Sequence, residues 1–226
     1  MTDYRLKMDA IEKLRILKEI YTYQQLERML GIQIPVLARY VSLKNLPNVD
    51  RARKIIEFYN KIDFSDIIKS KIVIKDEIID ITGILSNIKL LRMAAKAIDV
   101  DADLVLTMAV DGIPFGTIVA ERLNARIAYV KDKEEAGVSE FYQAKVSFGP
   151  GIYTKKYFLP KKLISKKDRI FLVDDILRTG KTFEILMDIA NQAKAEIIGG
   201  ATLIAKKDTI EVIKNKVKKF YTFYAF

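Results

Sequence analysis

The sequence predicts an α/β protein in which a parallel β-sheet, covered by helices on both faces, follows a small all-helical domain. Two observations carry this prediction. Apolar residues recur at helical spacing through residues 4–62, and from residue 72 onward short β-branched runs alternate with helical stretches. We therefore expect two domains, residues 1–65 and residues 66–226.

The composition limits the chemistry that the chain can perform. Its 226 residues, 50% of them hydrophobic, can bury a full α/β core beside a smaller domain. The absence of cysteine and histidine excludes disulfides, thiolate nucleophiles, cysteine zinc sites and the usual general base. No apolar run is long enough to span a membrane and the first residues lack a signal-peptide core, so we expect a cytoplasmic protein with no membrane partner.

The net charge of +10 predicts attraction to a polyanion, either nucleic acid or a phosphorylated small molecule. Residues 1–62 hold 12 Lys and Arg against 7 Asp and Glu, a net +5, which is half of the excess charge. A Lys-rich composition of the whole proteome would explain the high pI equally well. Charge alone therefore does not choose the partner.

Residues 22–41 have the pattern of two short helices joined by a tight turn. Gly31 can adopt the backbone angles of such a turn. The side chains expected to hold the two helices together are Leu26, Leu30, Ile32 and Leu37. With its Leu-Gly-Ile turn and a Leu-Pro-Asn entry into the following helix, this segment resembles the helix-turn-helix of the Cro and phage-repressor class.

This resemblance implies that residues 33–41 enter the major groove of double-stranded DNA, with Arg39 on a guanine edge or a phosphate. As N-cap of the next helix, Asn48 would direct free backbone amides at the DNA backbone. The residues expected at the interface are Gln33, Ile34, Pro35, Arg39, Lys44, Asn48, Arg51 and Arg53. The apolar recognition positions 34–36 leave open a helical dimerisation or docking module.

A second motif occupies residues 170–182, where four apolar residues precede two acids, two apolar residues and Arg-Thr-Gly-Lys-Thr. It predicts a buried strand that ends at the carboxyl edge of a parallel sheet, where open α/β folds bind ligands. Asp174 and Asp175 would lie at the strand tip, able to accept hydrogen bonds from ribose hydroxyls. The turn would present backbone amides and two Thr hydroxyls at a helix N-terminus, which suits phosphate. A nucleotide-triphosphatase P-loop is excluded because Asp175 stands where that motif needs glycine.

The motif resembles the signature of type I phosphoribosyltransferases. Similarity to the adenine and xanthine enzymes of that family, carried also by residues 79–85 and 101–105, extends over about residues 72–226. The resemblance implies that Asp174 and Asp175 contact the ribose hydroxyls and are the catalytic residues if the protein is active. It implies a 5′-phosphate loop formed by Arg178, Thr179, Gly180, Lys181 and Thr182. Arg178 and Lys181 stand where the family often has Thr or Gly, and this extra positive charge would either tighten phosphate binding or suit a ligand with more phosphates.

The resemblance also places a pyrophosphate loop at residues 109–116. There Asp111 and Gly112 would approach the ligand, with a helix starting at Pro114, and the arginine that the family's adenine enzymes carry in this loop is missing. Lys131 matches the family's basic residue near pyrophosphate. Mg²⁺ is expected to accompany the pyrophosphate of phosphoribosyl pyrophosphate and not to bind side chains directly.

Residues 132–156 match the mobile loop that closes over the substrate in this family. The segment is punctuated by Gly137, Gly149 and Gly151, and Ser139 and Tyr142 are its candidate phosphate contacts. A long unstructured connector is uncommon in a compact domain. We therefore favour a functional loop over a plain β-hairpin insertion.

Two functions from different classes follow from these resemblances. The first is a transcriptional regulator of purine or nucleotide metabolism, laid out like purine-repressor-like and archaeal phosphoribosyltransferase-like regulators, that binds DNA and senses phosphoribosyl pyrophosphate or a purine nucleotide. The second is an active purine phosphoribosyltransferase with an appended helical domain. The helix-turn-helix favours the first. A homodimer is expected because two-fold pairing lets both recognition helices reach major grooves about 34 Å apart.

Overall fold

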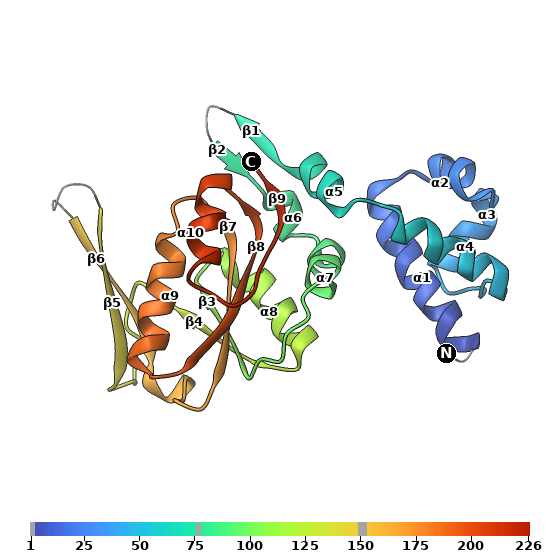
Figure 1. Cartoon of the computed structure of the whole chain (residues 1–226). Helices are drawn as coiled ribbons and strands as arrows, with labels where there is room; N and C mark the ends of the chain where they lie inside the picture. The colour runs from blue at the N-terminus through green and yellow to red at the C-terminus, as the bar shows by residue number, and fades with distance from the viewer. Residues whose placement is uncertain (1–2, 76–77, 149–152) are drawn as a thin grey trace. The chain divides into compact units, whose positions relative to one another are not determined.

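The computed structural model describes residues 3–75, 78–148 and 153–226, and the chain divides into two compact units, residues 1–67 and residues 68–226. Figure 1 labels the elements of both units. Across the described ranges, none of the helices combines the length and the apolar character needed to cross a lipid bilayer.

The first unit is helical, as the apolar spacing predicts. Its elements are α1 (Asp3–Ile20), α2 (Tyr23–Leu30), α3 (Ile34–Val41) and α4 (Val49–Asn60), followed by α5 (Phe64–Lys71). The predicted core is confirmed, since Leu26, Leu30, Ile32 and Leu37 are all buried. Helix α1 adds Leu14 and Leu17 to this core and packs against α4.

The turn between α2 and α3 forms as predicted. Thr22 and Gln25 close a capping box at the start of α2, which satisfies two backbone donors that the first turn of a helix leaves free. Gly31 ends α2 with a φ of +60°, a left-handed conformation that glycine adopts without a steric penalty. The chain therefore turns sharply enough to bring α3 back across α2.

The second unit is a parallel sheet with helices on both faces, in agreement with the predicted fold class. Its helices are α6 (Thr82–Leu85), α7 (Ile88–Lys96), α8 (Gly112–Leu123), α9 (Lys181–Gln192) and α10 (Lys207–Lys214), with a 3₁₀ turn at Lys161–Leu163. Its strands are β1 (Val73–Lys75), β2 (Ile78–Asp80), β3 (Leu104–Met108), β4 (Arg126–Val130), β5 (Phe141–Phe148), β6 (Tyr153–Pro160), β7 (Arg169–Leu177), β8 (Glu196–Ala205) and β9 (Phe220–Ala225).

The main sheet has the strand order β4-β3-β7-β8-β9, with every pair of neighbours parallel. Helices α9 and α10 cover one face, while α8, with α7 packed on it, covers the other (Figure 1). Because both faces are covered, the central strands are continuously apolar, and residues 104–106 and 170–173 are fully buried.

Two predicted boundaries were displaced. Helix α8 starts at Gly112 and not at Pro114. The acid pair lies inside β7 and not at its tip, because β7 stays paired with β8 as far as Leu177, although its pairing with β3 ends at Val173.

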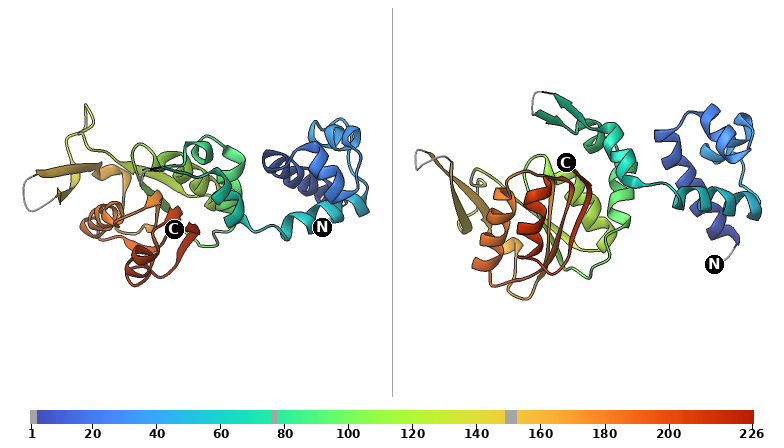
Figure 2. Two further views of the ribbon diagram at one scale, coloured as in Figure 1. Left: turned by 90° about the horizontal axis from the view of Figure 1, so that it is seen from above. Right: turned by 45° about the horizontal axis from the view of Figure 1, so that its top comes forward.

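The expectation of a mobile loop over residues 132–156, and not a β-hairpin, was wrong for the backbone, because residues 141–148 and 153–156 belong to the antiparallel hairpin β5–β6. Apolar and polar residues alternate along β5, so that Ala144 is buried between the exposed residues Gln143 and Lys145. The side chain of Gln192 on α9 donates a hydrogen bond to the carbonyl of Gln143, and both views in Figure 2 show the hairpin beside α9. Gly149 and Gly151 lie outside the described residues.

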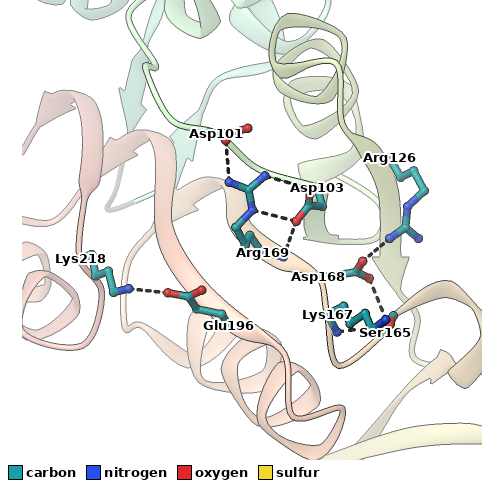
Figure 3. A network of polar contacts seen from close by, with 9 residues as sticks. All are labelled: Asp101, Asp103, Arg126, Ser165, Lys167, Asp168, Arg169, Glu196 and Lys218. Carbon is teal, nitrogen blue, oxygen red and sulfur yellow. Dashed lines mark hydrogen bonds and ion pairs between the residues drawn. The ribbon is translucent and has the colours of Figure 1, made fainter.

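An ion-pair network ties together the amino ends of β3 and β7 (Figure 3). Arg169 donates to Asp103 from its backbone N–H at 2.9 Å, from Nε at 3.0 Å and from Nη2 at 3.0 Å, and to Asp101 from Nη1 at 2.6 Å. Hydrogen bonds from the Arg169 side chain and backbone lower the pKa of Asp103 from 3.8 to about 2. The network therefore fixes the register of the two central strands.

We predict that Asp103→Asn lowers the melting temperature more than Asp101→Asn does, because Asp103 accepts three hydrogen bonds from Arg169 and Asp101 accepts one. A lowered folded-state pKa contributes stability above the ordinary pKa that is lost as the pH falls toward about 2. Melting curves between pH 7 and pH 2 should therefore show a shallower acid-side loss for Asp103→Asn. Identical acid-side slopes for wild type and variant would contradict this assignment.

Candidate functional site

The acid pair of β7 lies at the carboxyl edge of the sheet, between the starts of α8 and α9. Asp174 is 4% exposed and Asp175 is half-buried. The Thr202 hydroxyl on β8 donates to the backbone carbonyl of Asp175 at 2.9 Å, which holds this part of β7 in place. The sequence thus places two carboxyl groups next to each other in a largely dry environment.

Burial makes both carboxyl groups costly to ionise, and the contact between them raises the pKa of Asp174 but lowers that of Asp175. Burial, then the charge of Asp175 and a hydrogen bond with it, raises the pKa of Asp174 well above its usual value, whereas the Thr182 hydroxyl acts in the opposite direction. Burial is also the main cause of the raised pKa of Asp175, to which the charge of Asp111 contributes. The pair therefore favours partners that stabilise its charge, such as hydroxyl donors or a cation.

The loop after β7 leads directly into the N-terminus of α9. Gly180 caps that helix with a φ of +82°, and the Thr209 hydroxyl fixes the loop by donating to the carbonyl of Arg178 at 2.7 Å. Arg178 and Thr179 are exposed, while Lys181 and Thr182 are half-buried. A helix N-terminus beside basic side chains and hydroxyls is suited to an anion such as phosphate.

The loop before α8 lies directly against the acid pair. A Cβ atom at Gly112 would be 2.4 Å from Oγ1 of Thr107 and 3.2 Å from Oδ1 of Asp174. The hydroxyl of Thr107 is buried and has no hydrogen-bond partner among the described residues. Asp111 is exposed, and its charge acts on Asp175. Only a residue without a side chain fits between β3 and β7 at position 112.

Lys131 directly follows β4, at the same edge of the sheet as the acid pair but two strands away. Its backbone pairs with Phe158 of the hairpin, and its Nζ lies 2.6 Å from Oε2 of Glu135, which raises the pKa of Lys131. The Lys131 ammonium also lies 5.2 Å from the ring centroid of Tyr129. These residues line a cavity of about 170 Å³ at the base of the hairpin.

The two residues that the sequence suggested as phosphate contacts of the mobile loop lie before β5 and at its start. Ser139 precedes β5 and lines a cavity of about 280 Å³ with Lys161 and Lys162. Tyr142 lies on β5 and packs against the α/β core. Neither is carried by the turn of the hairpin.

In the first unit, the residues that the sequence assigned to DNA lie in α3, in the loop after it and at the start of α4. Those with exposed side chains are Gln33, Pro35, Arg39, Lys44, Asn48, Arg51 and Arg53, and Ile34 is half-buried. Asn48 caps α4 by accepting from the N–H of Arg51 at 2.9 Å. Nη1 of Arg51 donates to the hydroxyl of Tyr40 at 3.0 Å, so Arg51 also joins α4 to α3.

One residue that stabilises this surface was not predicted from the sequence. Oε1 of Glu27 on α2 accepts a hydrogen bond from the N–H of Ile34 at 3.1 Å, which satisfies a free donor in the first turn of α3. The acid lies seven residues before its partner and belongs to another helix. Local capping patterns therefore do not reveal it.

A family model for the phosphoribosyl transferase domain matches residues 75–224, more than half of the chain. The chain belongs to this family. A helix-turn-helix model matches residues 11–67, so the N-terminal unit carries the predicted motif.

Individual relatives fall into two groups. The chain is 28% identical over 163 residues, 70% of its length, to a protein of Streptococcus pneumoniae named "Probable purine biosynthesis transcriptional regulator PurR", and spans 58% of that relative's length. It is 26% identical over 148 residues to the adenine phosphoribosyltransferase of Mycoplasma capricolum, covering 63% of this chain and 83% of that one. The adenine phosphoribosyltransferase structure from Thermoanaerobacter pseudethanolicus has a TM-score of 0.62 over 72% of this chain and 99% of that chain, at 20% identity, and shares the fold.

We predict that Gly112→Ala destabilises the second unit by about 1–3 kcal/mol, because the added methyl group overlaps the buried Thr107 hydroxyl. Chemical denaturation measures this loss. Adding Thr107→Ala removes the overlapping atom, so the double variant should lose less stability than the two single changes together. Gly83→Ala is the matched control, since its nearest neighbour would be 3.8 Å away. Strict additivity of the two changes would contradict the close packing.

Proposed function

We propose that the protein is a DNA-binding transcriptional regulator of purine or nucleotide metabolism, and that its phosphoribosyltransferase-like unit senses phosphoribosyl pyrophosphate or a purine nucleotide. The observation that carries this proposal is the joining of a helix-turn-helix to a phosphoribosyl transferase domain in one chain. The 28% identity to a protein named as a purine biosynthesis regulator supports it. Such a regulator acts in the compartment that contains the DNA.

The ligand-binding part of the proposal rests on the geometry around β7. Asp174 and Asp175 would accept hydrogen bonds from ribose hydroxyls, which stabilises their ionised form. The phosphate would sit at the N-terminus of α9, held by Arg178, Thr179, Gly180, Lys181 and Thr182. The loop with Asp111 and Gly112, and then Lys131, would face the pyrophosphate.

Magnesium fits this arrangement as a companion of the ligand. Among the described residues, no group of three or more acidic side chains is placed to hold a metal ion by itself. Mg²⁺ in phosphate sites usually keeps several waters and binds phosphate oxygens of the substrate, so it needs no dedicated cage of side chains. In this proposal Mg²⁺ neutralises pyrophosphate charge, and the protein side chains orient the complex.

The loop before α8 favours sensing over catalysis. Transfer of the ribosyl group makes pyrophosphate the leaving group, and positive groups around it lower the barrier. Here the exposed loop presents Val110 and Asp111. An acid at this point stabilises departing negative charge poorly, although a bound ligand with Mg²⁺ is still accommodated.

An active purine phosphoribosyltransferase is the second candidate. The acid pair and the phosphate loop support it because an enzyme needs the same groups as a sensor, and the chain covers 83% of a relative named as an adenine phosphoribosyltransferase. Pyrophosphate release that depends on an added purine base, assayed with phosphoribosyl pyrophosphate and Mg²⁺, distinguishes the two. Turnover at ordinary enzymatic rates would favour the enzyme.

The DNA-binding part of the proposal involves two copies of the chain. One helix-turn-helix with few polar recognition residues binds weakly, whereas a homodimer places two of them on half-sites of one operator. The exposed basic residues Arg39, Lys44, Arg51 and Arg53 would neutralise phosphates, so affinity should fall steeply with salt.

We predict that Asp174→Asn combined with Asp175→Asn weakens phosphoribosyl pyrophosphate binding by roughly 100-fold or more, through lost charge-assisted hydrogen bonds. The same change should raise the melting temperature at neutral pH, because burial raises the pKa of both carboxyl groups and ionising them destabilises the fold. Calorimetric titration and thermal melting measure the two effects. Asp208→Asn is the control, because Asp208 is exposed. A double variant that melts at a lower temperature and keeps its ligand affinity would show that the pair has a structural role and does not bind the ligand.

We predict that Arg39→Ala weakens DNA binding while leaving ligand affinity nearly unchanged, because Arg39 belongs to the other compact unit. The salt dependence of DNA affinity should fall by about one unit of slope if Arg39 neutralises one phosphate. Fluorescence anisotropy with labelled duplex DNA at several salt concentrations measures this. Unchanged DNA affinity in Arg39→Ala, together with base turnover by the wild type, would overturn the regulator proposal.

A further inference from the structure

The outward face of α3 offers DNA mostly apolar surface. Leu37 and Tyr40 are buried and fix which side of the helix faces the core. With 3.6 residues per turn, the opposite side carries Pro35, Ala38 and Arg39, followed by Ser42 at the C-cap. Pro35 is exposed and Ala38 is half-buried.

Several polar groups near this face are already engaged within the protein. The Ser42 hydroxyl donates to the carbonyls of Ala38 at 2.8 Å and of Arg39 at 3.3 Å. Glu27 accepts from the first N–H of α3. This leaves the side chains of Gln33 and Arg39, at opposite ends of the helix, to read base edges by hydrogen bonding.

The surroundings of this face are basic. Arg39, Lys44, Arg51 and Arg53 are exposed on α3, on the following loop and in the first turns of α4. Such a rim complements the phosphate backbone, and because a helix-turn-helix model matches residues 11–67, we take duplex DNA as the occupant of the apolar strip inside it.

In the major groove, the apolar group that distinguishes one base from the others is the C5-methyl group of thymine, which small apolar side chains contact. We propose that α3 recognises its operator chiefly through thymine methyl groups packed against Pro35 and Ala38, so that each half-site is rich in A·T pairs under the first turns of α3. This inference rests on the proposed DNA-binding function and names the bases that it reads. Gln33 would add one bidentate contact to an adenine beside them.

The test begins with selection of bound duplexes from a random-sequence pool by the full-length protein, with and without phosphoribosyl pyrophosphate and Mg²⁺. A·T pairs should be enriched in each half-site. Each thymine of the selected operator is then replaced singly by deoxyuridine, which removes only the methyl group. Affinity should fall about fourfold for each methyl group that is buried against α3.

Protein variants distinguish the contribution of thymine methyl contacts to DNA affinity from the contribution of charge. Pro35→Ser with Ala38→Ser should bring the affinities for the thymine and deoxyuridine duplexes together, whereas Arg39→Ala should weaken both by the same factor. Tyr4→Ser is the control, because Tyr4 is an apolar side chain that is 63% exposed on α1, outside the proposed contact. Unchanged melting temperatures show that the folds are intact.

The outcomes separate this inference from the function on which it rests. Selection of G·C-rich half-sites, or deoxyuridine duplexes that bind as tightly as thymine duplexes, overturns methyl recognition while DNA binding stands. Recovery of no duplex under either condition overturns both proposals. Loss of the thymine preference in Pro35→Ser with Ala38→Ser, but not in Tyr4→Ser, is the result that we expect.

Discussion

The site in the second unit depends on two adjacent carboxyl groups inside β7, of which Asp174 is buried and Asp175 half-buried. Burying two acids at one point is costly unless hydrogen bonds compensate them, and here the Thr182 hydroxyl and the backbone of Asp175 and Ile176 supply part of that compensation. The surrounding structure follows from this constraint. Position 112 must lack a side chain to let the loop approach Asp174, and Thr202 and Thr209 hold the carbonyls of Asp175 and Arg178. Carboxyl groups whose pKa values are raised in this way are typical of functional sites.

A structural feature could be predicted from the sequence when the residues that form it are close together along the chain. Three features were predicted because a segment of about ten consecutive residues determines each of them. They are the acid pair, the helix N-terminus after it and the turn at Gly31. The strand β5 could also be predicted locally, because apolar and polar residues alternate along residues 141–148. The resemblance to a mobile loop led to the other prediction. Family resemblance and residue pattern disagreed there, and the pattern described the backbone correctly.

The long-range interactions were not predictable from pattern. Arg169 and Asp103 are 66 residues apart, and nothing in either segment indicates that their strands are neighbours until the sheet order is known. The contact of Gly112 with Thr107 and Asp174 has the same origin, since it depends on where β3 and β7 place α8. Glu27 likewise reaches the start of α3 only because α2 and α3 fold back on each other. The sequence therefore predicted the candidate site residues better than it predicted the distant residues that hold them in position.

In both units the candidate binding surface offers its ligand few polar partners, and this affects how ligand binding would act on DNA binding. In the proposed function, a ligand that stabilises the charge of the acid pair would shift the second unit toward the conformation that binds it best. Helix α3 would offer DNA few hydrogen-bonding groups, so each copy would bind weakly. In the proposed homodimer, affinity then depends on both copies engaging at once, which is set by the spacing between them. A ligand that changes this spacing would control operator binding without altering any residue that touches DNA.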